Sequence, residues 1–172
     1  VIGVSLSAIF VRYSQAPALI TAAYRLIWTV LIMTPAVLAN KKVIGEIKNM
    51  KGRALLLCAA SGIFLAFHFS LWFESLNLTS VASSTAIVCT EVIWVALGYC
   101  IFMKGQLVTK AKISIAITVA GSIVIAMADG SAGGNSLYGD FLALLSALFS
   151  TVYTLIGKQV RKNLSTTAYT FI

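Results

Sequence analysis

The residue best placed to do chemistry in this sequence is a carboxylate inside a long apolar run. The run covers residues 80–103, and Glu91 lies near its middle. Its length suffices to cross a bilayer, because about 20 apolar residues in a helix span the hydrocarbon. An ionisable side chain at the bilayer centre costs at least about 2.5–3.5 kcal/mol, so such residues are functional candidates by default. A buried carboxylate can bind a cationic group or carry a proton. The alternative is a structural hydrogen bond to a neighbouring helix.

Helical spacing gives Glu91 a polar approach from one end of its run. Ser80 and Ser84 fall on the same helical face as Glu91, at steps of three or four residues. We therefore include Ser84 with Glu91 in a predicted substrate or proton pathway.

Two further groups of side chains are candidates for this pathway. His68 and Trp72 lie one helical turn apart and could form an aromatic patch that holds apolar or cationic solutes. A lone histidine is more often a packed, hydrogen-bonded residue. The second group is a polar stripe at helical spacing, for which ordinary interhelical hydrogen bonding is the alternative; it consists of Ser146, Ser150 and Tyr153.

Two intramembrane charges fit a structural role better. Arg25 lies about six residues inside an apolar run, where it could bind a substrate carboxylate or pair with a neighbouring helix. We favour pairing, with Glu74 or a backbone carbonyl as its partner.

Composition identifies the class of protein that must position these residues. The 172 residues are 59% hydrophobic and 10% charged, with a mean hydropathy of +0.95, whereas soluble domains carry roughly 25% charged residues. The sequence predicts an all-α, polytopic membrane helix bundle. Its net charge of +8 therefore reports membrane topology and does not indicate nucleic-acid binding. No phosphate-binding loop, metal-ligand cluster or nucleophile motif occurs, so we expect no enzyme, metal or cofactor.

Seven apolar runs alternate with loops of unequal charge. The expected spans are 1–16, 19–39, 54–76, 80–103, 113–128 and 137–157, with a seventh beginning near residue 166. Eleven of the 13 cations lie after the even-numbered spans, in loops 40–53, 104–112 and 158–165. The positive-inside rule places these loops, and the original amino terminus, in the cytoplasm. We expect a multi-pass protein of the plasma or inner membrane.

A weak internal repeat accompanies this alternation. Residues 6–10, Leu-Ser-Ala-Ile-Phe, resemble residues 145–149, Leu-Ser-Ala-Leu-Phe. A repeated unit of five helices would insert its second copy upside down, a common plan of secondary transporters.

Loose motifs in a specific order resemble a known family. They are Ala-Tyr-Arg-Leu at 23–26, the turn from Trp72 to Ala86, and the Gly121 region followed by Gly139-Asp140. Together they resemble the EamA-type branch of the drug/metabolite transporter superfamily. The resemblance implies ten helices in two inverted repeats, of which about six and a half would lie in this chain, a fragment of a longer protein. Residues 1–128 would form the first repeat with a truncated first helix, 129–136 an outer loop, and 137–172 the beginning of the second.

The resemblance also implies a function. A secondary-active transporter would move small metabolites or drug-like solutes by alternating access, as an exporter, with coupling to protons or another ion. Many members have Pro after the position of Glu91, and this chain has Val92. We therefore expect residues 80–103 to form one continuous helix. A non-transporting membrane scaffold or assembly subunit is the alternative function.

Overall fold

The computed structural model describes residues 13, 16–130 and 137–172, with the side chains of 125–130 left aside. Most of the expected first span, 1–16, and most of the expected outer loop, 129–136, therefore lie outside the described residues. The elements that follow are all helices: α2 (Ala18–Ala39), α3 (Lys41–Lys48), α4 (Gly52–Leu78), α5 (Val81–Cys89), α6 (Glu91–Phe102), α7 (Thr109–Gly130), α8 (Leu137–Val160) and α9 (Thr166–Phe171). The prediction of an all-α membrane bundle is confirmed for this part of the chain.

Four helical stretches are long and apolar enough to cross a membrane. They are Ala18–Ala39, Gly52–Leu78, Val81–Phe102 and Leu137–Val160, and they match four of the predicted spans to within a few residues. Large apolar side chains such as Trp28, Leu56 and Phe102 are exposed on their outer faces. Because lipid is as apolar as these side chains, such an exterior is typical of a membrane bundle.

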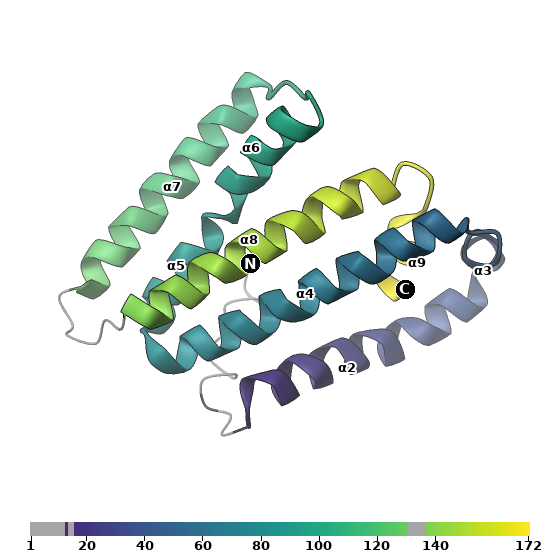
Figure 1. Ribbon diagram of the computed structural model, residues 1–172, viewed down its shortest axis with the longest axis horizontal. Helices are drawn as coiled ribbons and strands as arrows, with labels where there is room; N and C mark the ends of the chain where they lie inside the picture. Colours follow the sequence, from purple (N-terminus) through teal and green to yellow (C-terminus); the bar gives the residue numbers. More distant parts are fainter. Residues whose placement is uncertain (1–12, 14–15, 131–136) are drawn as a thin grey trace.

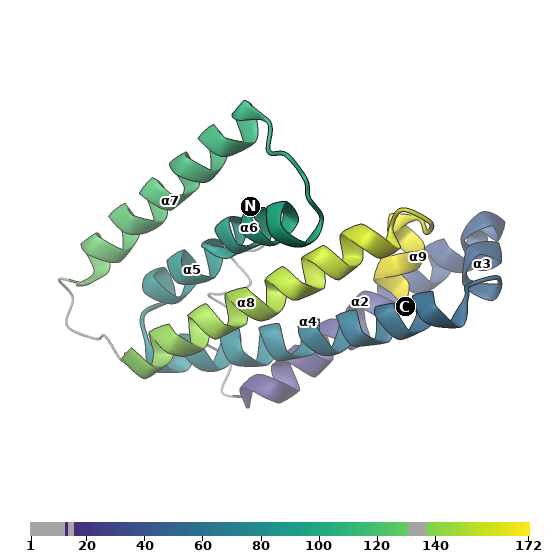
Figure 2. The ribbon, with the colours of Figure 1, turned by 45° about the horizontal axis from the view of Figure 1, so that its top comes forward.

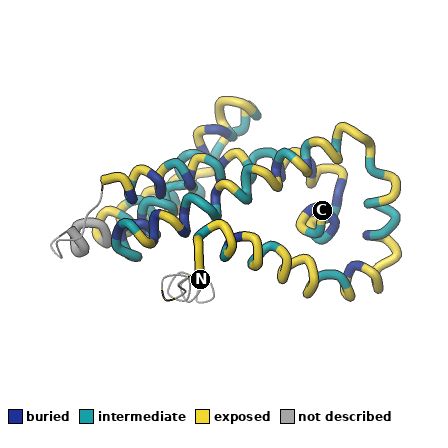
Figure 3. The backbone as a smooth tube through the Cα atoms, turned by 60° about the horizontal axis from the view of Figure 1, so that its bottom comes forward, coloured by how far each residue is buried: buried dark blue, intermediate teal, exposed yellow. Residues whose placement is uncertain are grey.

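Helices α4 and α8 form the centre of the molecule. They run antiparallel and pack along their lengths, with α2 on the flank of α4 (Figures 1 and 2). The α5–α6 segment packs on α8, and α7 packs on α5. Buried positions line the facing sides of the long helices, whereas much of α2 is exposed (Figure 3).

The predicted continuous helix over 80–103 is wrong. It divides at Thr90 into α5 and α6, drawn in Figure 1 as two coils joined by a short turn. The Thr90 hydroxyl donates to the Ile87 carbonyl at 2.6 Å, and the Ile93 amide bonds to the Thr90 carbonyl at 2.9 Å. A hydroxyl that bonds back to the preceding turn competes with the helical ladder and bends it. The division thus arises without proline, immediately before Glu91.

The basic loops are shorter in the structure than the sequence predicted, because helices take up part of each. Loop 40–53 contains α3, which the Asn40 side chain caps by accepting from the amides of Lys42 and Val43. Helix α7 begins within the 104–112 loop, and α8 extends to Val160. The alternating helix directions bring the remaining basic connections to one end of the bundle (Figure 1).

At that basic end, α3 is joined to the start of α9. Glu46 Oε2 accepts from the Ser165 amide at 2.9 Å. Hydrogen bonds from the Ser165 side chain and backbone lower the pKa of Glu46 below its usual value. The ionised carboxylate is the form these bonds favour, so the link is expected to weaken on acidification.

Candidate functional site

Glu91 lies in the first turn of α6 and faces α8. Its side chain is half-buried, and its Oε1 accepts a hydrogen bond from Thr154 Oγ1 at 3.0 Å. The start of a helix carries a partial positive charge from its unpaired amides, which favours a carboxylate there. The structure thus contains the interhelical hydrogen bond that the structural interpretation of Glu91 requires. A single hydroxyl donor leaves most of the carboxylate's acceptor capacity for another ligand.

Thr154 also lines a hollow between α6, α7 and α8. The hollow measures about 530 Å³ and is walled mainly by apolar residues, with Thr154, Ser114 and Gln106 among its polar ones. Ligand pockets of roughly 300–1,000 Å³ are typical for small molecules. Glu91 is therefore hydrogen-bonded to a residue that lines a space large enough for a small solute.

A lysine bounds this hollow toward the basic end. The Lys158 ammonium lies 3.2 Å from the centre of the Tyr99 ring, and both residues line the hollow. The ring face attracts a cation and holds the ammonium in place. The candidate site therefore has an acidic group near one end and a basic group at the other.

His68 is sealed in the contact between α4 and α8. Its Nδ1 lies 2.9 Å from Ser146 Oγ and 3.1 Å from the Ser146 carbonyl oxygen, and Ser146 Oγ donates to the His68 carbonyl at 2.9 Å. His68 is 7% exposed and Ser146 is fully buried. These two predicted pathway residues meet each other, in the packed arrangement that we gave as the alternative.

Trp72 lies one turn after His68 on α4 and packs toward α2. It belongs to a buried cluster with Ala22 and Phe73, and its ring is stacked on His68 at a centroid distance of 6.0 Å. Its buried indole N–H has no hydrogen-bond partner among the described residues. Such an orphan donor needs an explanation, and a ligand or a further part of the protein would supply one.

The two predicted structural charges lie apart from Glu91's contacts. The Arg25 guanidinium carbon lies 4.5 Å from the centre of the Phe69 ring, so this cation packs between α2 and α4. Glu74 is exposed. An Arg25–Glu74 pair remains a prediction.

The remaining predicted pathway residues lie on α5 and α8. Ser84 is fully buried and hydrogen-bonded to Ser75 at 2.6 Å, within the α4–α5 contact. Ser150 is buried on α8. The Tyr153 ring is stacked on Tyr169 of α9 at 6.0 Å. The Ser84 hydroxyl is thus used in the α4–α5 contact, and the polar approach to Glu91 that the shared helical face predicted stays a prediction.

Two polar contacts were missed by the sequence reasoning. The first is the hydrogen bond from Thr154 to Glu91. The second is made by Asp140, whose Oδ1 accepts from Thr79 Oγ1 at 2.9 Å and from Ser83 Oγ at 3.1 Å. Asp140 therefore joins the start of α8 to the α4–α5 turn at the end opposite the basic connections. The sequence did mark Asp140, since it stands at a predicted helix start, but the sequence does not identify its hydrogen-bond partners.

The described residues contain no group of three or more potential metal ligands.

Comparison with known proteins gives one informative similarity. Over 132 residues, 74% of this chain, the sequence is 32% identical to a protein of Bacillus subtilis (strain 168) named uncharacterized transporter YxxF. The chain covers 42% of that protein's length. No protein-family model matches the chain, and no solved structure matches it. The chain is thus a helical membrane protein similar to a bacterial transporter.

Proposed function

We propose that this chain is part of a secondary-active transporter of the EamA type, which exports small metabolites or drug-like solutes by alternating access. The observation that carries the proposal is the half-buried Glu91 carboxylate within a membrane span, next to the helix division at Thr90. Its hydrogen-bond donor, Thr154, lines a hollow of about 530 Å³. The similarity to a bacterial transporter supports the same function.

The proposed mechanism uses Glu91 for two competing ligands. One carboxylate can hold a proton or a cationic group of the solute, so loading one releases the other. Exchange between them would couple export to a proton gradient. Thr154 holds the carboxylate toward α8 in either case, and the division at Thr90 lets α6 move relative to α5. The repeats, of which α8 and α9 would begin the second, would rock about this site.

The test is proton-driven flux in vesicles that contain the full-length protein. A panel of small organic cations and amino acids is loaded, a pH gradient is imposed, and efflux is measured. We expect Glu91→Gln to abolish proton-driven flux, because an amide cannot take up a proton. Glu74→Gln is the matched control, since it removes an exposed carboxylate from a neighbouring span, and it should retain flux. Full activity of Glu91→Gln would remove the proton-carrier role.

A non-transporting scaffold is the second candidate function. The observation that favours it is the sealed His68–Ser146 contact, which uses two predicted pathway residues for helix packing. Vesicles that contain folded full-length protein and show no flux of any solute in the panel, with or without a pH gradient, would favour the scaffold.

A further inference from the structure

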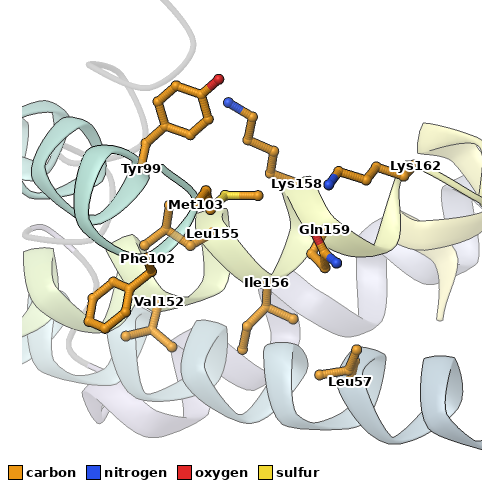
Figure 4. A pocket seen from close by; sticks show the side chains of 10 residues that line it. All are labelled: Leu57, Tyr99, Phe102, Met103, Val152, Leu155, Ile156, Lys158, Gln159 and Lys162. Atoms are coloured by element: carbon orange, nitrogen blue, oxygen red, sulfur yellow. The ribbon is translucent and has the colours of Figure 1, made fainter. Parts of the chain in front are cut away.

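A second hollow lies between α4, α6 and α8, on the side of Leu155 away from α7. It measures about 670 Å³. Figure 4 shows Lys158 and Lys162 along one edge and apolar side chains along the other. Its lining consists of Leu57, Tyr99, Phe102, Met103, Val152, Leu155, Ile156, Lys158, Gln159 and Lys162.

The polar side chains of this hollow gather at its basic end. Lys158 and Lys162 lie one turn apart in the chain, and Gln159 stands beside them. Stacking on Tyr99 keeps the Lys158 ammonium at the rim. The described lining includes no acidic residue, so an anion placed here would meet two positive charges and an amide donor.

The apolar side chains continue from this basic rim into the membrane span. Phe102 is 80% exposed and Val152 is 36% exposed, so the hollow opens sideways where lipid would lie. Apolar walls that lead away from two cations match a molecule with an anionic head and a hydrocarbon tail. Basic pockets between membrane helices are known to bind anionic lipid headgroups.

We propose that this hollow is a binding site for an anionic phospholipid, with its phosphate between Lys158 and Lys162 and an acyl chain along Val152 and Phe102. The proposal requires only that the helices lie in a membrane and does not depend on transport. The charge complementarity of the two lysines selects an anionic lipid over a zwitterionic one.

The experiment measures lipid binding to the full-length protein in mild detergent. Phosphatidylglycerol and phosphatidylcholine are titrated separately, and native mass spectrometry gives the binding constant of each. Wild type should bind phosphatidylglycerol more tightly. The double variant Lys158→Gln/Lys162→Gln should lose roughly 30-fold in its phosphatidylglycerol constant, since each lysine near an anionic headgroup contributes about a factor of five.

Two further variants separate this site from general electrostatics. Lys110→Gln/Lys112→Gln removes the same charge from the same end of the molecule but outside the hollow, and it should bind as wild type does. Val152→Phe fills the apolar part of the hollow without changing charge, and it should weaken phosphatidylglycerol binding because the acyl chain loses its place.

Several outcomes would overturn the proposal. Equal losses in the two lysine variants would show a nonspecific charge effect, and equal binding of the two lipids would show no headgroup recognition. Absence of retained lipid on wild type would mean that another part of the full-length protein fills the hollow. Displacement of the lipid by inorganic phosphate alone would indicate a soluble anion site instead.

Discussion

At the scale of single residues, the contact between His68 and Ser146 shows two polar side chains whose hydrogen bonds serve helix packing. The serine hydroxyl reaches both the imidazole Nδ1 and the His68 carbonyl oxygen, each at 2.9 Å. Both residues are buried, so these bonds lie in a low-dielectric interface where an unpaired group is costly. The pair therefore fixes α4 against α8.

Removing this hydroxyl should lower the stability of the protein and leave its transport activity largely unchanged. We expect Ser146→Ala to lower the free energy of unfolding in detergent by about 1 kcal/mol, within the range measured for hydrogen bonds between membrane helices. Ser70→Ala is the matched control, because Ser70 donates only to the Ala66 carbonyl of its own helix. That variant should unfold almost as wild type does.

The same variants decide between packing and pathway for His68 and Ser146. Flux per folded molecule should be retained in Ser146→Ala if the pair is structural. A large loss of flux with unchanged unfolding would place the two residues in the pathway.

The sequence identified Glu91 as a candidate, but it did not identify the residues that surround Glu91 in the structure. A carboxylate in an apolar run is conspicuous because of its insertion cost. Its partner Thr154 is 63 residues away, and the chain offers many hydroxyls at similar depth. Which of them meets the carboxylate depends on the packing of α6 against α8, and no local pattern encodes that packing.

At the scale of helices, hydropathy predicted most elements because a bilayer imposes their length. Four spans and the start of α9 agree with the sequence to within a few residues. The division at Thr90 was missed because neither proline nor glycine marks it. It depends on a threonine hydroxyl bonding to Ile87, a choice that threonine makes only in some helices. Helix α3 was missed because its polar, basic composition resembles a loop.

The junction between the α4–α5 turn and the start of α8 offers a test of helix packing. A Cβ added at Gly139 would lie 2.9 Å from Thr79 Cβ and 3.0 Å from the backbone carbon of Leu78. Because backbone cannot yield as a flexible side chain does, Gly139→Ala should separate the two elements. We expect it to lower the free energy of unfolding by about 1–3 kcal/mol, the usual cost of overpacking.

Gly62→Ala provides the comparison for that measurement. Nothing lies within 4 Å of a Cβ added at Gly62 in α4, so the higher helix propensity of alanine should leave stability equal or raise it by up to about 1 kcal/mol. If both glycine variants unfold alike in denaturant titrations, the close approach at Gly139 does not exist in the protein.

At the scale of the whole molecule, helix direction and charge agree. Each of the basic connections follows a helix that runs toward the same end, so Lys41, Lys104 and Lys162 lie at one end although 121 positions separate the first from the last. The turn at Thr79 and Ser80 and the start of α8 lie at the other end. Such segregation has a physical cause in the membrane, where loops rich in lysine and arginine are retained in the cytoplasm.

This arrangement predicts the accessibility of single cysteines in intact cells. Cys58, Cys89 and Cys100 are free thiols and would first be replaced by alanine. A membrane-impermeant maleimide should then label Asn77→Cys, at the end without basic loops, and should label Lys51→Cys only after the membrane is permeabilised. Both positions are exposed, so a difference between them reports the side of the membrane. The reverse pattern would invert the predicted topology. It would not reverse the proposed exchange at Glu91, because a proton that moves inward down its gradient drives the solute outward in either orientation of the protein.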